Sequence, residues 1–152
     1  MDFRRIASIS AIALGILLVL GGIGTWSVVS STLADQNITT PEDALLPERA
    51  VRGPFTAYAQ AEIIEQHALE STGGLTYAEL DRDDPLRDTA MNASFLQASL
   101  FTSVLAFGVS AMAIAMGVLF VLIGLGIRDV KRRVDDIAPT ASTDRRTVAA
   151  SS

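Results

Sequence analysis

Two long stretches of this chain, residues 6–34 and 89–127, contain no charged residue. An α-helix rises about 1.5 Å per residue, so about 20 residues cross a hydrocarbon core about 30 Å thick. Each stretch is therefore long enough to span a bilayer. The mean hydropathy of +0.38 over 152 residues also exceeds what a soluble domain usually shows, and the surplus lies in these two stretches.

We predict an all-α membrane protein: an antiparallel two-helix transmembrane hairpin with a small helical extracytoplasmic cap and a long second helix. The predicted segments are a cytoplasmic N-terminus 1–5, a transmembrane helix 6–30, an acidic extracytoplasmic helical domain 31–94, a transmembrane helix 95–127 and a cytoplasmic tail 128–152. The second helix is expected to start near residue 85. The tail is basic at first and is expected to be disordered beyond Pro139.

Basic residues follow or precede the two spans on one side of the predicted hairpin. They are Arg4, Arg5, Arg128, Lys131, Arg132 and Arg133. Because such residues are retained in the cytoplasm, we expect a multi-pass protein of the plasma membrane with both termini cytoplasmic. Residues 31–94 carry twelve acids and four arginines, a net charge of −8, which suits the translocated segment. The basic residues can also contact anionic lipid.

A cleaved signal peptide is the competing interpretation of the first span. Phe3, Arg4 and Arg5 are typical of the start of a signal peptide, and residues 32–34 are similar to a cleavage site. The apolar run is longer than the 7 to 15 residues of a signal core, however. This favours a retained anchor.

Small side chains recur at alternating spacings of three and four in both spans, which is a heptad pattern. The predicted helix-packing residues are Gly15 and Gly22 in the first span and Ser103, Ala106, Ser110, Ala113 and Gly117 in the second. In lipid, small residues let two helix backbones approach closely, so we expect these seams to face each other. Alternatively, the pattern arises by chance, faces a neighbouring protein or lines an oligomeric pore. Ala111 and Ala115 lie off the seam, which hints at a partner.

Local signals divide the middle segment into short helices. Thr40 before Pro41 is typical of a helix start, and a second helix is expected from Pro54 to the stop at Gly73 and Gly74. Thr76 and Glu79 have capping-box spacing, which indicates one further turn. The expected cap core consists of Phe55, Tyr58, Ile63, Leu69, Leu75, Tyr77 and Leu80 against Leu86, Met91, Phe95 and Leu96.

Residues that carry chemistry are sparse. There is no cysteine, and His67 is the only histidine, so two imidazoles of one chain cannot hold a metal. The densest carboxylate cluster, Asp81, Asp83 and Asp84 with Glu79, departs from the EF-hand pattern at Pro85 and favours a helix cap at Asp84. We therefore predict no cofactor, while a weak binding site at His67 and the three aspartates stays open.

Several runs carry a resemblance to a known family. They are Gly24-Thr25-Trp26, Gly53-Pro54-Phe55 and residues 31–39, 76–81, 84–87 and 89–95. These runs, spread over most of residues 5–127, resemble a family of small actinobacterial two-helix membrane proteins, often labelled aromatic ring-opening dioxygenase LigA. That label implies non-haem iron held by two histidines and a carboxylate. One histidine cannot supply that site, so no catalytic residue is carried over.

The expected function is that of a non-enzymatic accessory or scaffold protein of the cell envelope. Its expected partners are the lipid bilayer and another membrane or envelope protein, or a second copy of itself. No basic outer patch or phosphate loop indicates nucleic-acid binding. The alternatives are an enzyme or metal-dependent binding module that uses His67 with Asp81, Asp83 and Asp84, and an oligomeric pore.

Overall fold

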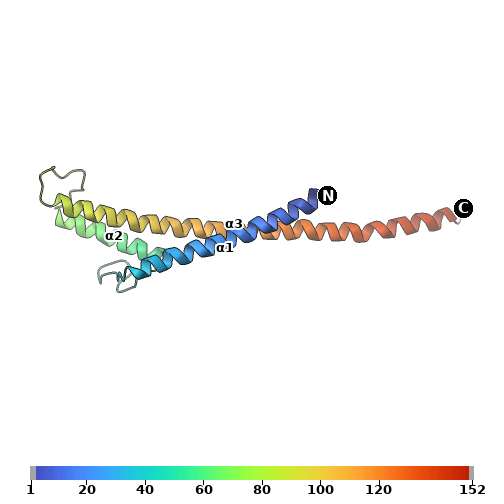
Figure 1. The fold of residues 1–152 in the computed structure, drawn as a ribbon, viewed down its shortest axis with the longest axis horizontal. Coiled ribbons are helices and arrows are strands. Elements are labelled where there is room, and N and C mark those ends of the chain that lie inside the picture. Colours follow the sequence, from blue (N-terminus) through green and yellow to red (C-terminus); the bar gives the residue numbers. More distant parts are fainter. Residues whose placement is uncertain (1–2, 151–152) are drawn as a thin grey trace. The chain divides into compact units, whose positions relative to one another are not determined.

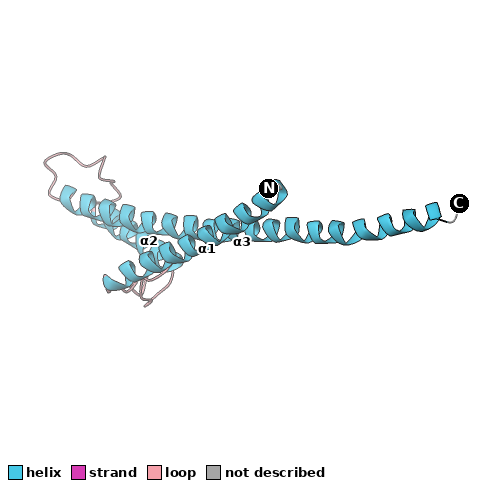
Figure 2. Ribbon diagram, turned by 45° about the vertical axis from the view of Figure 1, so that its right-hand side comes forward, coloured by secondary structure: helices cyan, strands magenta, loops and turns pink. Residues whose placement is uncertain are grey.

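The computed structural model describes residues 3–150, with side chains described in residues 3–130. In residues 3–150 the chain forms three helices and no strand: α1 (Phe3–Asp35), α2 (Pro54–Ser71) and α3 (Arg87–Ala150) (Figures 1 and 2). One isolated antiparallel bridge joins Thr39 and Ala50. The prediction of an all-helical fold is confirmed for this part of the chain.

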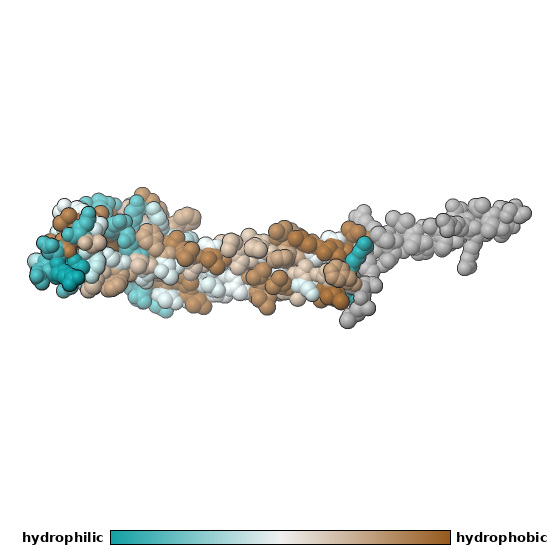
Figure 3. Space-filling model, turned by 90° about the horizontal axis from the view of Figure 1, so that it is seen from above, coloured by the Kyte–Doolittle hydropathy of each residue, from teal (hydrophilic) through white to brown (hydrophobic). Residues whose placement is uncertain are grey.

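Two helical stretches are long enough and apolar enough to cross a membrane: Phe3–Asp35, with 33 residues, and Arg87–Val130, with 44. Only 17% of the most apolar window of each is buried by the rest of the chain. Hydrophobic residues accordingly cover much of the helix surface in Figure 3. A core helix of a soluble protein would bury such residues, so both stretches are compatible with membrane helices.

The chain divides into two compact units, residues 1–21 with 113–152 and residues 22–112. In the first unit, α1 and α3 run antiparallel, because Ser8 lies against Gly124 and Gly15 against Gly117. The Ser8 hydroxyl donates a 2.7 Å hydrogen bond to the carbonyl oxygen of Gly124. The glycines at these contacts let the two backbones approach closely.

In the second unit, α2 packs through its small side chains. Ala57 and Ala61 are fully buried and belong to a core completed by Leu33, Val51, Leu100 and Phe107. Ala57 and Ala61 are four residues apart and therefore share one face of α2, which we call the alanine face. Its small side chains let α2 lie close to its neighbours. The Gln97 side chain adds a 2.7 Å hydrogen bond from α3 to Glu65 of α2.

This packing corrects the predicted cap core in part. Ile63 and Leu80 are buried as expected, but Phe55 is 80% exposed and Phe95 66% exposed. Tyr58, Leu75, Tyr77, Leu86 and Leu96 are also exposed. In α2, the helical phase that buries Ala57 and Ala61 turns Phe55 and Tyr58 outward.

The segment between α1 and α2 does not form the short helix predicted at Thr40. The Thr40 side chain is 1% exposed; its hydroxyl donates to the carbonyl of Leu46 and accepts from the backbone N–H of Arg49 at 2.9 Å. The Thr40 N–H donates to the Arg49 carbonyl at 3.0 Å. Thr40 therefore closes a loop instead of capping a helix, because its partners lie six and nine residues away.

α2 begins and ends where local signals predicted. Gly53 occupies its N-cap and Pro54 its first turn. At the other end, Gly73 and Gly74 have φ values of +68° and +91°, and Gly74 donates to the Leu69 carbonyl at 2.7 Å. These left-handed conformations are readily adopted by glycine, and they stop the helix.

Thr76 and Glu79 form half of the expected capping box, in a segment that makes a single turn. The Glu79 carboxylate accepts from the Thr76 backbone N–H at 2.9 Å and from its hydroxyl at 2.7 Å. α3 then starts at Arg87, two residues after Pro85. The Asp84 carboxylate accepts from the Leu86 N–H at 2.8 Å, so Asp84 closes the turn that leads into the helix.

At its far end, α3 extends to Ala150 and thus passes Pro139, beyond which we expected a disordered tail. Alanine and arginine, both strong helix formers, recur in this part of the sequence. The prediction of disorder rested instead on its serine and threonine content.

Candidate functional site

The predicted seam residues lie on the less exposed faces of α1 and α3. Gly15, Gly22, Ser110 and Gly117 are buried, while Ser103, Ala106 and Ala113 are partly buried. In contrast, Gly108, Ala111, Met112 and Ala115 of α3 are exposed. The small residues of the two helices thus separate into a covered set and an uncovered set.

The serine hydroxyls of the seam are engaged by backbone carbonyls. Ser110 is 2% exposed, and its hydroxyl donates to the Ala106 carbonyl at 2.7 Å. Ser103 donates to the Ser99 carbonyl at 3.2 Å. These donors are therefore used inside the chain.

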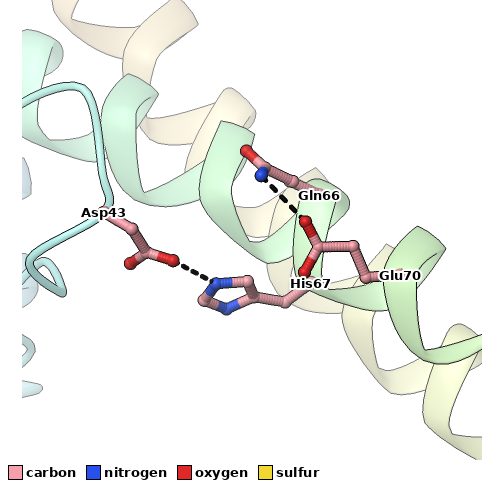
Figure 4. Close-up of polar contacts among 4 residues, drawn as sticks. All are labelled: Asp43, Gln66, His67 and Glu70. Carbon is pink, nitrogen blue, oxygen red and sulfur yellow. Dashed lines mark hydrogen bonds and ion pairs between the residues drawn. The ribbon is translucent and has the colours of Figure 1, made fainter.

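His67 pairs with an acid that sequence reasoning missed. Its Nε2 lies 2.7 Å from Oδ2 of Asp43, which is in the loop before α2 (Figure 4). The hydrogen bond from His67 lowers the pKa of the Asp43 carboxyl below its ordinary value. Beside this pair, the Gln66 amide donates to Glu70 at 2.9 Å. Both partners of the His67–Asp43 pair are about half exposed, so the contact fastens the loop to α2 at the surface.

The aspartates proposed to accompany His67 do not join it. Asp84 serves the turn before α3, and Asp81 and Asp83 lie on exposed positions of the same turn. Among the described residues, no three His, Asp or Glu side chains come close enough together to hold a metal ion. The geometry therefore gives the His67 and aspartate site no support.

The basic residues at the ends of the spans fall partly within the described side chains. Arg4 and Arg5 of α1 and Arg128 of α3 are exposed and line a common cavity. Lys131, Arg132 and Arg133 lie outside the residues whose side chains are described. The shared cavity was not visible in the sequence, because its parts are more than 120 residues apart.

Apolar side chains left uncovered on α3 form what we call the α3 outer face. In the second unit its members, which are 52% to 68% exposed, are Phe95, Leu96, Leu105, Val109 and Met112. Large apolar side chains left exposed in this way mark contact with lipid or with another protein.

Two pairs of aromatic rings also lie in the second unit. Tyr58 of α2 meets Phe101 of α3 edge to face, with ring centroids 5.9 Å apart, and Phe55 stands exposed three residues before Tyr58. Trp26 of α1 meets Phe107 in the same way at 4.7 Å. Aromatic rings with a polar end are typical of the membrane–water boundary.

Comparison of the chain with protein-family models, with curated proteins and with solved structures yielded no match.

Proposed function

We propose that this protein is a plasma-membrane hairpin that serves as an accessory or scaffold protein, with its acidic segment outside the cytoplasm. The first support is the uncovered apolar surface of α1 and α3. With 17% of each apolar window buried, most of these side chains need an apolar environment, and lipid supplies one. The basic residues around Arg4, Arg5 and Arg128 favour cytoplasmic ends.

The observation that carries the scaffold role is the length over which α3 leaves large apolar side chains exposed. From Phe95 to Leu125, both exposed, the helix rises about 45 Å at about 1.5 Å per residue. A hydrocarbon core covers only about 30 Å. If lipid covers the end next to Arg128, Phe95 and Leu96 stand above it in water. A partner protein that packs against Phe95 and Leu96 would remove them from water.

Location and topology are tested with single cysteines, because the native chain has none. Ser71→Cys places a thiol on the acidic segment, and Ser142→Cys places one on the tail. A membrane-impermeant maleimide applied to intact cells should label the first and spare the second until the membrane is opened. The reverse pattern, or recovery of the chain in the soluble fraction, would contradict the proposal.

The scaffold role is tested by placing a photoreactive phenylalanine analogue at position 95, with position 62 on exposed α2 as the control. Irradiation of living cells, followed by gentle solubilisation and mass spectrometry, should give one recurrent adduct at position 95 and none at position 62. The Phe95→Ser, Leu96→Ser double variant should keep its fold but lose the association. A chain that crosslinks to nothing and purifies as a monomer would contradict a scaffold role.

A further inference from the structure

The ends of α1 and α3 in the first unit enclose a cavity of about 280 Å³. It is lined by Arg4, Arg5, Ser8, Ile9, Ile12, Ile127 and Arg128. Three of these side chains are permanently charged guanidiniums, and three are isoleucines. The cavity therefore combines a cationic rim with an apolar wall, a composition that neither a purely structural contact nor a soluble anion site requires.

The guanidiniums have room for an external anion. Arg4, Arg5 and Arg128 are all exposed, so their guanidinium groups are accessible to an anion from outside the chain. Arg4 and Arg5 also lie in the first turn of α1, where the helix dipole favours negative charge. Guanidinium groups bind phosphate oxygens through two parallel hydrogen bonds. A phosphate group is thus the anion that this rim suits best.

The apolar wall decides between a soluble phosphate and a lipid. Ile9 lines the cavity and is 58% exposed, and Ile6, one turn before it on α1, is 46% exposed. The wall is therefore continuous with the outward apolar surface of α1. A soluble ion would leave this wall uncovered, whereas the acyl chains of a lipid would cover it.

The volume of the cavity determines which part of a lipid molecule can enter it. Sites for drug-sized ligands enclose about 300 to 1,000 Å³, and this cavity lies just below that range. It suits a headgroup, with the acyl chains left outside along α1. Basic cavities between membrane helices on the cytoplasmic side are known to bind anionic headgroups.

We propose that the Arg4, Arg5 and Arg128 cavity is a binding site for an anionic glycerophospholipid of the inner leaflet. The three guanidiniums hold the phosphate, and Ile9, Ile12 and Ile127 contact the first part of the acyl chains. This site rests on the proposed membrane location. It differs from a general attraction of basic residues to the membrane because it has a fixed stoichiometry and a shape.

The test uses the full-length protein in mild detergent, studied by native mass spectrometry and thermal unfolding. Phosphatidylglycerol should bind with one high-affinity equivalent and raise the unfolding temperature, whereas phosphatidylcholine should not. Inorganic phosphate and sn-glycerol 3-phosphate form separate arms. If either binds as tightly as phosphatidylglycerol, the cavity recognises phosphate without the lipid, and the lipid assignment is overturned.

Amino-acid variants distinguish binding in this cavity from a general attraction between basic residues and anionic lipid. Arg128→Gln should weaken phosphatidylglycerol binding about fivefold, as expected for one basic side chain at an anionic surface, and the Arg4, Arg5, Arg128 triple glutamine variant about a hundredfold. Arg82→Gln removes one charge from the acidic segment and should bind as the wild type does. Ile9→Trp keeps every charge but fills the cavity, and it should also lose the tight equivalent.

Equal binding by Ile9→Trp and the wild type would overturn the site, because it would show that charge alone attracts the lipid. Each variant must unfold at the wild-type temperature in detergent without added lipid, which excludes misfolding as the cause. Cysteine labelling that places the chain in the membrane, together with no preference for phosphatidylglycerol, would refute this site alone. Labelling that places it elsewhere would refute the proposed function itself.

Discussion

Gly15 of α1 and Gly117 of α3 each occupy the space that a side chain on the other would need. A Cβ atom at Gly15 would lie 2.5 Å from the carbonyl oxygen of Gly117, and one at Gly117 would lie 2.6 Å from the carbonyl oxygen of Gly15. Both obstacles are backbone atoms, so a side chain at either position forces the helices apart. The contact thus depends on glycine at both positions.

We therefore expect Gly15→Ala and Gly117→Ala to lower the free energy of unfolding by about 1 to 3 kcal/mol, the usual cost of overpacking, with larger losses for leucine. Gly21 and Gly108 are matched controls, because a Cβ at either meets nothing within 4 Å. Alanine there should leave stability unchanged or raise it, since alanine favours helix. Thermal unfolding in one detergent compares all four; equal effects would refute the contact.

A second prediction concerns α2, which buries Ala57 and leaves Phe55 exposed. Ala57→Leu introduces three carbon atoms into a fully buried position and should cost about 1 to 3 kcal/mol. Phe55→Ala removes a large side chain that is 80% exposed and should change stability by no more than about 0.5 kcal/mol. Denaturant unfolding monitored by Trp26 fluorescence distinguishes the two. A larger loss of stability for Phe55→Ala than for Ala57→Leu would show that Phe55 belongs to the core.

The surface carboxylates give a third prediction. Hydrogen bonds from Thr76 lower the pKa of Glu79 below its ordinary 4.5, and the bond from His67 lowers that of Asp43 below 3.8. Their contributions to stability are therefore complete above these ordinary values and are lost as the pH falls through the lowered ones. Glu79→Gln should flatten the loss of stability in acid.

The Asp43 pair can be followed directly by carboxyl carbon resonances in a pH titration. His67→Ala should return the titration midpoint of Asp43 upward toward 3.8 and leave Glu79 where it was. It should also speed hydrogen exchange in the loop around Asp43. An Asp43 midpoint that does not respond to His67→Ala would show that the two side chains are not paired in solution.

The fourth prediction is that the first span is retained. Residues 32–34 lie inside α1, which ends at Asp35, and Leu33 belongs to the buried core of the second unit. Removal of α1 would expose the groups that Leu33 covers. Intact mass and N-terminal sequencing of the protein from membranes should therefore find α1 present; a chain beginning near Asp35 would establish a cleaved signal peptide instead.

How much the sequence could predict depended on the range of the interactions. The bounds of α2 follow from Gly53, Pro54 and the Gly73-Gly74 pair, which act within a few residues of themselves. The buried positions of Gly15 and Gly117 follow from a repeat along each helix. Both kinds of signal are contained in neighbouring sequence, so they could be used without a structure.

Other features depended on contacts between distant residues. Thr40 before Pro41 has the residues of a helix start, but its partners at Leu46 and Arg49 require the loop to close. His67 meets Asp43 across 24 positions, and no local pattern links them. The choice of alanines over aromatics on α2 depended on how closely α3 could approach. The resemblance to the actinobacterial family stays a prediction.

With the proposed partner, the alanine face of α2 would also affect how the protein is maintained in a cell. Ala57 and Ala61 are fully buried, but each removes little more than a methyl group from water, at about 0.8 kcal/mol per carbon. Larger side chains such as Phe95 remain outside. A partner that covers them adds its binding free energy to that of folding. Copies made in excess of the partner would then open more often and be degraded by membrane proteases, so the partner's supply would set the abundance of this chain.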